Sequence, residues 1–324
     1  MANLMRCASR KQVAQEVTRG VVEGALGWKQ GTVEQVRERI ARLPGLTPQV
    51  AHDGWTYSLA ISRSETDFAE EIRRPVELLS RSARKGHPVC LVLDEFQQIA
   101  EVDANLGGVF KAITDDLPGV SLVFAGSRRH MMQRLFVGRN APLQNVADPL
   151  ALTVIAEDEM VAFLHARSAA GGRTMTGSAA LLTYSLVRGI PHFVQLLAAA
   201  AWDQGTDPID EPTVKRGLVD VLVHQRGNLA DRFESLTNGQ RKFVQALAGK
   251  PTRQLDSQNF LDVADLAKSS AQRARSQLEE LEHIIWDERM GWRLQDPIFE
   301  RYLIHGHPLE VGQELSPEVT AGGL

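Results

Sequence analysis

Two continuous apolar runs restrict the fold of this chain more than any other feature of its sequence. The first covers residues 89–93 and the second residues 120–125, with a helical pattern over residues 106–117 between them. A strand that is apolar on both faces belongs inside a sheet that helices cover on both sides. The order strand, helix, strand favours parallel pairing of the two strands. We therefore predict an α/β fold built on a parallel sheet with both faces covered.

The composition fits a soluble globular protein of two or three domains. Of the 324 residues, 43% are apolar and 23% are charged, which is enough apolar material for a core. The net charge of -4 provides no overall basic field for nucleic acid or acidic lipid. Because only Cys7 and Cys90 occur, we exclude a disulfide framework, and Cys90 is predicted to be a core residue. We find no signal peptide and no apolar run of membrane-spanning length, so we expect a cytoplasmic protein without membrane contact.

The segment before the first run predicts helices and a hairpin. The apolar period predicts helices over residues 9–26, with Ser9 as the N-cap, over residues 67–84, and in a segment that starts at Thr32. Strict alternation over residues 50–61 predicts the hairpin.

The pattern changes after the second run. Residues 152–155 are compatible with a last strand, and residues 158–226 have a helical pattern that glycines interrupt. Three further helices are predicted over residues 239–248, 260–268 and 269–283, followed by a two-stranded segment over residues 284–294. Three helices and a hairpin in this order are typical of a winged helix-turn-helix unit.

An acidic pair, Asp94 and Glu95, ends the first apolar run. Ligands of α/β sheets bind at the carboxyl ends of the strands, so both carboxylates are predicted to lie at a binding edge. In phosphoryl-transfer sites the first acid holds Mg²⁺ and the second activates the attacking water as a general base. The alternative is that Asp94 caps the next helix and Glu95 is a solvated residue of its first turn.

The second run delivers Ser127 and Arg128 to the same predicted edge. A hydroxyl there senses a γ-phosphate, and a guanidinium neutralises charge that develops during transfer. The alternative is that the arginine is a solvated loop residue.

The order of these segments resembles the STAND-type P-loop ATPases of the AAA+ kind. The resemblance is strongest to the archaeal-type ATPases that also occur in bacteria. In that family the phrase LDEFQ, here residues 93–97, is the Walker B motif, and FAGS, here residues 124–127, ends the sensor-1 strand. A Gly-x-Pro turn of the helical domain matches Gly189 and Pro191, and the phrase DPIFERYL of residues 296–303 matches the end of the winged helix.

The resemblance implies ATP and Mg²⁺ as cofactors and a role for each matching residue. Asp94 organises the metal and Glu95 activates water, while Ser127 and Arg128 sense the γ-phosphate. The turn from Gly189 to Pro191 covers the nucleotide. The implied domains are an ATPase core over residues 1–155, a helical lid over 156–230, a winged helix over 231–307 and a flexible tail over 308–324.

One family motif is missing from the sequence. No Gly-x-x-x-x-Gly-Lys-[Ser/Thr] loop occurs, although its backbone N–H groups and lysine normally hold the β- and γ-phosphates. We expect that the first strand, this Walker A loop and its helix precede Met1 in an ATPase whose N-terminus is truncated. Loss of that strand leaves an unpaired edge in the sheet. A degenerate ATPase that does not bind nucleotide is the competing interpretation.

Two functions therefore stay open for the chain. The favoured one is an ATP-binding and hydrolysing molecular switch, with an unidentified protein partner or self-association. The alternative is a non-catalytic winged-helix adaptor or DNA-binding regulator. Residues 232–301 contain 11 Lys or Arg and 11 Asp or Glu, so DNA is possible as a partner but not favoured.

Overall fold

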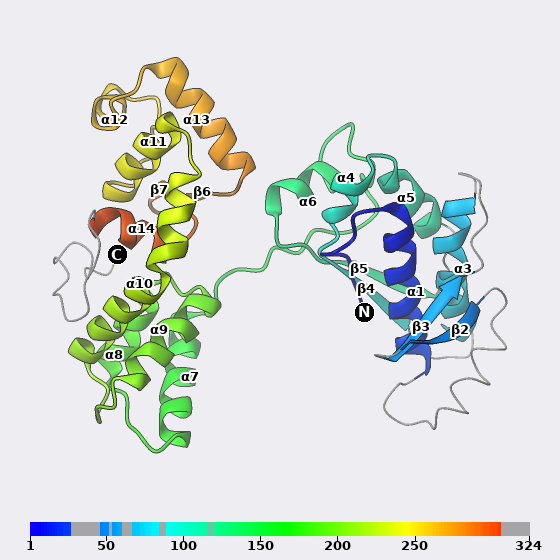
Figure 1. The fold of residues 1–324 in the computed structure, drawn as a ribbon, viewed down its shortest axis with the longest axis horizontal. Helices are drawn as coiled ribbons and strands as arrows, with labels where there is room; N and C mark the ends of the chain where they lie inside the picture. Colours follow the sequence, from blue (N-terminus) through cyan, green and yellow to red (C-terminus); the bar gives the residue numbers. More distant parts are fainter. Residues whose placement is uncertain are drawn as a thin grey trace. The chain divides into compact units, whose positions relative to one another are not determined.

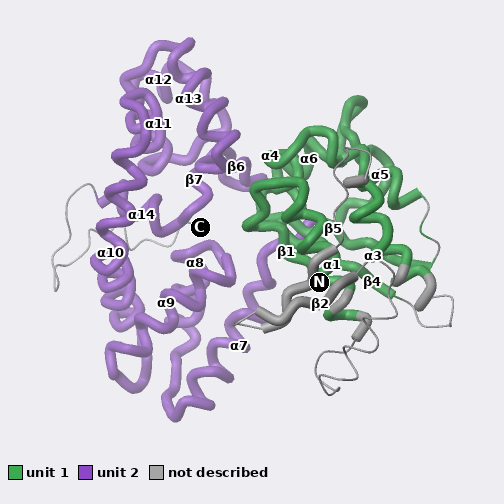
Figure 2. The backbone as a smooth tube through the Cα atoms, turned by 45° about the vertical axis from the view of Figure 1, so that its right-hand side comes forward, with its two compact units in different colours: residues 1–150 green, residues 151–324 purple. Residues whose placement is uncertain are grey.

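The structure, a computed structural model of the 324-residue chain, divides into two compact units. It describes residues 1–26, 46–51, 54–59, 67–83, 89–115, 117 and 119–305. Unit 1 is residues 1–150 and unit 2 is residues 151–324 (Figures 1 and 2). Each unit has its own hydrophobic core. The predicted helix from Thr32 and the predicted tail over residues 308–324 lie outside the described residues.

Unit 1 contains the predicted parallel sheet. Its strands are β1 (Ala2–Asn3), β4 (Val89–Asp94) and β5 (Val120–Phe124), in the spatial order β1-β4-β5. The chain passes from β1 to β4 through α1 (Arg10–Leu26), the antiparallel hairpin of β2 (Leu46–Ala51) and β3 (Gly54–Leu59), and α3 (Asp67–Ala83). It passes from β4 to β5 through α4 (Gln98–Val102) and α5 (Leu106–Asp115), and α6 (Arg129–Phe136) follows β5. The α/β class, the parallel pairing and the hairpin are confirmed.

The first helix shows how the sequence sets the local structure of unit 1. The Ser9 hydroxyl accepts a hydrogen bond from the Gln12 N–H at 3.3 Å, as an N-cap does. Val13, Val17 and Val21 recur every four residues and are all buried in the core that α1 shares with α3, β1 and β4. The helix therefore begins where predicted, and its apolar period faces the core.

The prediction that helices cover both faces of the sheet is wrong for the described residues. Leu91 and Leu93 of β4 are buried in the core of α1, α3 and α5. Cys90, on the opposite face of the strand, is exposed and is not the predicted core residue, and Val123 of β5 is 45% exposed. The sheet has two crossovers, from β1 to β4 and from β4 to β5, and both run toward the same edge of the sheet. Crossovers between parallel strands are right-handed, so two that run the same way place their helices on the same face. The other face is left open at Cys90 and Val123 within the part of the chain that the structure describes.

The edge of the sheet at β5 is also open, since β5 pairs only with β4 among the described strands. The predicted strand over residues 152–155 does not form, and Leu152 is 91% exposed. A strand needs a neighbour for its N–H and C=O groups, and no described strand is paired to this segment.

Unit 2 is helical apart from one hairpin. Its helices are α7 (Glu157–Ala170), α8 (Gly177–Leu186), α9 (Pro191–Asp203), α10 (Glu211–Glu234), α11 (Asn238–Gly249), α12 (Gln258–Ala264), α13 (Lys268–Glu280) and α14 (Pro297–His305). The antiparallel strands β6 (Ile284–Asp287) and β7 (Gly291–Leu294) form the predicted hairpin. Helix α12 ends earlier than predicted, because Asp265 takes a left-handed conformation with φ 48° at its C-cap. None of the described helices is long and apolar enough to cross a membrane.

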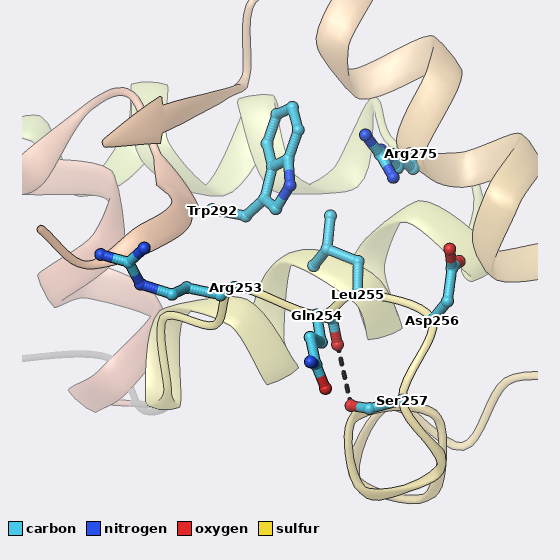
Figure 3. A pocket seen from close by; sticks show the side chains of 7 residues that line it. All are labelled: Arg253, Gln254, Leu255, Asp256, Ser257, Arg275 and Trp292. Carbon is cyan, nitrogen blue, oxygen red and sulfur yellow. Dashed lines mark hydrogen bonds between the residues drawn. The ribbon is translucent and has the colours of Figure 1, made fainter. Parts of the chain in front are cut away.

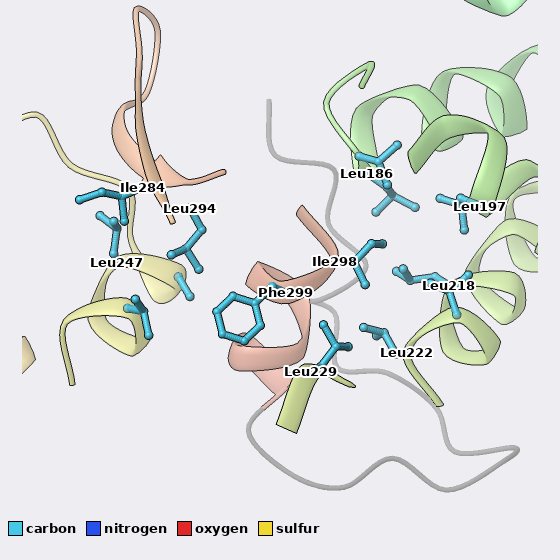
Figure 4. Close-up of a cluster of buried hydrophobic side chains, with 14 of the residues drawn as sticks. Leu186, Leu197, Leu218, Leu222, Leu229, Leu247, Ile284, Leu294, Ile298 and Phe299 are labelled. Atoms are coloured by element: carbon cyan, nitrogen blue, oxygen red, sulfur yellow. The ribbon is translucent and has the colours of Figure 1, made fainter. Parts of the chain in front are cut away.

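One core extends through the whole of unit 2. Figure 4 shows Ile298 and Phe299 of α14 between Leu222 of α10 on one side and Leu247 of α11 on the other. Buried polar contacts reinforce this core, because the Arg301 Nε donates to the Leu186 carbonyl at 3.0 Å. The helical segment before residue 230 and the segment after it therefore share one apolar cluster. The predicted boundary between a lid and a winged helix stays a prediction.

We predict that the two cysteines differ sharply in reactivity toward dithionitrobenzoate in the folded protein at about pH 8. Cys90 should react quickly because it lies on the open face of the sheet. Cys7 is 2% exposed, and burial, with a smaller contribution from Glu16, raises the pKa of its thiol to about 11, so it should react only after unfolding. Cys90→Ser should remove the fast phase and Cys7→Ser should keep it. Equally slow reaction of both thiols would show that the Cys90 face is covered in solution.

We also predict that unit 2 loses stability below about pH 6.5 through His283. The Arg232 guanidinium donates to His283 Nδ1 at 2.9 Å, so that nitrogen must be unprotonated. Burial, and then the charge of Arg232, lowers the pKa of His283 below its usual value. As the pH falls through about 6.5, the unfolded chain therefore binds a proton that the folded chain does not, and the free energy of unfolding decreases.

Urea unfolding of the wild type and of His283→Gln, which keeps an acceptor for Arg232, measures this effect. The variant should lose stability less steeply between about pH 7.5 and about pH 5.5. His165→Gln, on the exposed surface of α7, is the control for loss of a histidine. An identical pH dependence in wild type and His283→Gln would show that His283 does not carry the effect.

Candidate functional site

The turns after β4 and β5 are tied to each other at the carboxyl ends of the two strands. The Ala125 N–H donates to the Leu93 carbonyl, and the Phe96 N–H donates to the Ala125 carbonyl, each at 2.9 Å. The Phe96 ring is fully buried and packs on Phe124, with 4.5 Å between the ring centroids. The packing of Phe96 on Phe124 holds two turns side by side. One turn carries Asp94 and Glu95, and the other carries Ser127.

Glu95 and Ser127 come into direct contact across the two turns. The Ser127 hydroxyl donates to Glu95 Oε2 at 2.9 Å, and the Gln97 amide nitrogen donates to the same oxygen. The backbone of Glu95 has φ 53°, a left-handed conformation that costs a residue with a side chain about 1 kcal/mol or more. Backbone strain of this kind at a half-buried carboxylate is typical of a functional site.

The first strand positions Asp94. The Asn3 amide donates to Asp94 Oδ2 at 3.0 Å, and the Glu95 N–H donates to Asp94 Oδ1 at 3.1 Å. The alternative in which Asp94 caps the next helix is wrong, because the N-cap of α4 is Gln97 and no side chain caps that end.

Gln97 is the buried centre of the cluster. Its side chain is 3% exposed, and its amide nitrogen lies 3.4 Å from the Ser127 hydroxyl in addition to its bond to Glu95. Its Oε1 has no hydrogen-bond partner among the described residues. A Cβ at Gly126 would lie 2.4 Å from this oxygen, so the glycine gives the amide its space.

Arg128 lies at the same edge but is held by another carboxylate. It is the N-cap residue of α6, its guanidinium donates to Glu101, and about half of its side chain is exposed. The structure therefore brings Asp94, Glu95 and Ser127 together and directs Arg128 toward Glu101.

The other two predicted site residues, Gly189 and Pro191, belong to unit 2. Gly189 has φ 65°, and a Cβ there would lie 2.4 Å from the Tyr184 ring, so only glycine fits this turn. Pro191 is the first residue of α9, a position where its missing N–H costs no hydrogen bond.

The sequence patterns did not single out Asn3 or Gln97. Gln97 stands inside the phrase that carries the acidic pair, yet its burial against Glu95 depends on how β5 packs. Asn3 is a polar residue at the end of a two-residue strand, too short to be recognised from alternation. The described residues contain no cluster of three or more His, Cys, Asp or Glu side chains that could hold a metal.

We predict that Gln97→Glu destabilises unit 1 at neutral pH. The change replaces the buried amide that donates to the half-buried Glu95 by a second carboxylate, and two carboxylates in contact repel each other. Thermal unfolding at about pH 7.5 should show a lower midpoint than the wild type, and the difference should shrink at about pH 5 as the pair takes up a proton. Gln133→Glu, exposed on α6, is the matched control. Equal midpoints for Gln97→Glu and the wild type at neutral pH would contradict the contact.

Comparison with known proteins gives a fold but no family. No family model matches the sequence, and no curated protein matches it. Among solved structures, the Walker-type ATPase Paby2304 of Pyrococcus abyssi aligns over 93% of this chain and 81% of its own, with 14% identity and a TM-score of 0.60. The Aeropyrum pernix ORC2 protein, solved as ADPNP-ADP complexes, covers 93% of this chain and 77% of its own at 11% identity and a TM-score of 0.47. The first of these similarities shows that this chain has the fold of a Walker-type P-loop ATPase.

Proposed function

We propose that this chain is an ATP-responsive molecular switch of the STAND type. The observation that carries the proposal is the contact of Ser127 with Glu95 beside Asp94, at the carboxyl edge of the sheet of a Walker-type fold. Ligands of open α/β sheets bind at this edge. Two acids and a hydroxyl at the ends of neighbouring strands are residue types that hold Mg²⁺ and activate water in phosphoryl transfer.

Each residue of the cluster has a distinct task in this proposal. Asp94, oriented by Asn3, offers a carboxylate oxygen to Mg²⁺. Ser127 and Gln97 occupy Glu95 Oε2, so Oε1 is the oxygen left to accept a proton from the attacking water. The metal, when bound, supplies charge neutralisation at the phosphate oxygens. Arg128 reaches a phosphate only after leaving Glu101, which makes it a sensor that must change partners.

The donor set fits Mg²⁺, and ATP binding by this chain is proposed to rest on the metal and the acidic pair, because the sequence contains no Walker A loop. Mg²⁺ needs only one or two carboxylates when waters and phosphates complete its shell. A cradle of backbone N–H groups for the phosphates is missing from the sequence.

Unit 2 supplies the responsive part of the switch. We propose that α11, α12, α13 and the β6–β7 hairpin form a winged helix, and that Gly189 and Pro191 belong to a lid that covers the nucleotide. Arg188, next to this turn, donates to the carbonyls of Leu294 and Gln295 at 2.7 and 2.8 Å. These contacts join the turn to the end of the hairpin, and we propose that a change at the turn is passed through them to a protein partner or a second copy.

Titration of the chain with fluorescent ATP, with and without Mg²⁺, tests this function. We expect Mg²⁺-dependent binding that Asp94→Asn weakens roughly tenfold or more, as loss of one charge-assisted contact of about 1.5–3 kcal/mol implies. Glu95→Gln should keep binding and lower hydrolysis by about 10²–10⁴-fold, the contribution of a general base. Asp115→Asn, exposed on α5, is the matched control.

The outcomes separate the switch from the adaptor. No Mg²⁺-dependent binding up to millimolar ATP would contradict the switch for this chain and favour a non-catalytic adaptor, which the missing phosphate loop supports. Equal binding by wild type and Asp94→Asn would contradict the role of Asp94.

A further inference from the structure

A second candidate site lies in unit 2, in a pocket beside the β6–β7 hairpin. The pocket has a volume of about 350 Å³ and is shown in Figure 3. Leu255 and Trp292 give it an apolar wall, and Arg253, Arg275, Ser257 and Asp256 bring polar groups to it. This volume lies at the lower end of the range of about 300–1,000 Å³ for small-molecule sites, so it suits one nucleotide-sized group.

Two arginines and two tryptophans form a continuous ladder along this surface. The Arg275 guanidinium stacks 4.5 Å from the centre of the Trp292 ring. Trp292 meets Trp286, its cross-strand partner in the hairpin, with 5.6 Å between ring centroids. The Arg253 guanidinium lies 5.9 Å from the Trp286 ring. The ladder therefore has the two tryptophan rings in its middle and one guanidinium at each end. Trp286 is 46% exposed.

The ladder is built into the fold rather than formed by loose surface chains. Thr252 and Trp292 exchange two backbone hydrogen bonds, at 3.1 and 2.7 Å, which fix the segment before Arg253 against the hairpin. The Arg253 Nη2 donates to the carbonyls of Glu288 and Arg289 at 2.5 and 3.1 Å. Among the described residues no acceptor is bonded to its Nε or Nη1, so these donors are available to a ligand.

Acidic side chains near the pocket offset part of the positive charge of its two arginines. Glu279 lies 3.4 Å from the Arg275 Nε, and the exposed Asp256 lines the pocket. Residues 232–301 are neutral as a whole, but the fold gathers two guanidiniums on one aromatic surface. The surface therefore offers two guanidiniums and an exposed aromatic ring, which suit a ligand that carries both negative charge and flat apolar groups.

We propose that this surface, which we name the Arg–Trp ladder, binds single-stranded nucleic acid. Phosphates pair with Arg253 and Arg275, and a base stacks on the exposed ring of Trp286. Base faces are open to stacking in single strands and closed in a duplex, which is why the exposed ring of Trp286 favours the single strand. An acidic peptide would pair with the arginines but gain little from the tryptophans.

Fluorescence anisotropy of a short labelled oligothymidine with the full chain tests this proposal. We expect binding at low salt that weakens as salt rises. Trp286→Ala should reduce affinity about fivefold or more, since stacking of one base is worth that much, and Trp286→Phe should restore most of it. Arg253→Gln should lower affinity and make the salt slope shallower by about 0.7. Asp256→Asn, which removes a negative charge from the pocket, should tighten binding.

A distant arginine variant and a folding measurement serve as controls. Arg167→Gln, at the exposed C-terminal end of α7, should leave binding unchanged, and circular dichroism should show every variant folded. A labelled oligouridine separates RNA from DNA as the source of the strand. The proposal is overturned if no binding occurs at low salt, or if Trp286→Ala binds like the wild type. It is equally overturned if duplex DNA or polyglutamate displaces the oligonucleotide as well as an unlabelled single strand does. None of these outcomes depends on ATP binding by unit 1.

Discussion

The parallel pairing of β4 with β5 is the constraint on which the candidate site of unit 1 depends. The register places Leu93 beside Phe124, so the polar residues that follow each strand emerge at one edge. Phe96 then locks the first turn into the core by packing on Phe124. A shift of one residue in this register would turn Leu91 and Leu93 away from the core and separate Glu95 from Ser127. The same register of β4 against β5 is therefore needed to bury the core residues of unit 1 and to bring Glu95 next to Ser127.

In unit 2 a buried arginine, Arg188, fixes a turn, whereas in unit 1 the packing of Phe96 on Phe124 does so. Arg188 has left-handed backbone at φ 59° and donates to two carbonyls at the end of β7. Burial lowers the pKa of its guanidinium to about 10, an effect that Glu300 partly offsets. The pair of carbonyl contacts offsets part of this desolvation and fixes one geometry between the turn at Gly189 and the hairpin. Any signal that moves this turn therefore acts on the same body that carries the Arg–Trp ladder.

Local patterns predicted most elements because they reflect local physics. The apolar period over residues 9–26 predicted α1, and the two-stranded pattern over residues 284–294 predicted the β6–β7 hairpin. Apolar character on both faces of β4 predicted a second helical layer that the described residues do not contain, since apolarity shows which faces can be covered and not what covers them. Residues 152–155 failed as a strand for a similar reason, because a strand exists only with a neighbour.

The sequence by itself determined the α/β class, the parallel strands and the chemical types at their ends, because strand period and the carboxyl-edge rule need no tertiary information. It identified Asp94, Glu95 and Ser127 as residues that meet, and two of them are joined by a hydrogen bond. Only the tertiary structure decided that Gln97 holds Glu95, that Arg128 faces Glu101, and that four residues of a neutral segment form one ladder. These contacts join residues from different elements, and their distances depend on packing that no local pattern encodes.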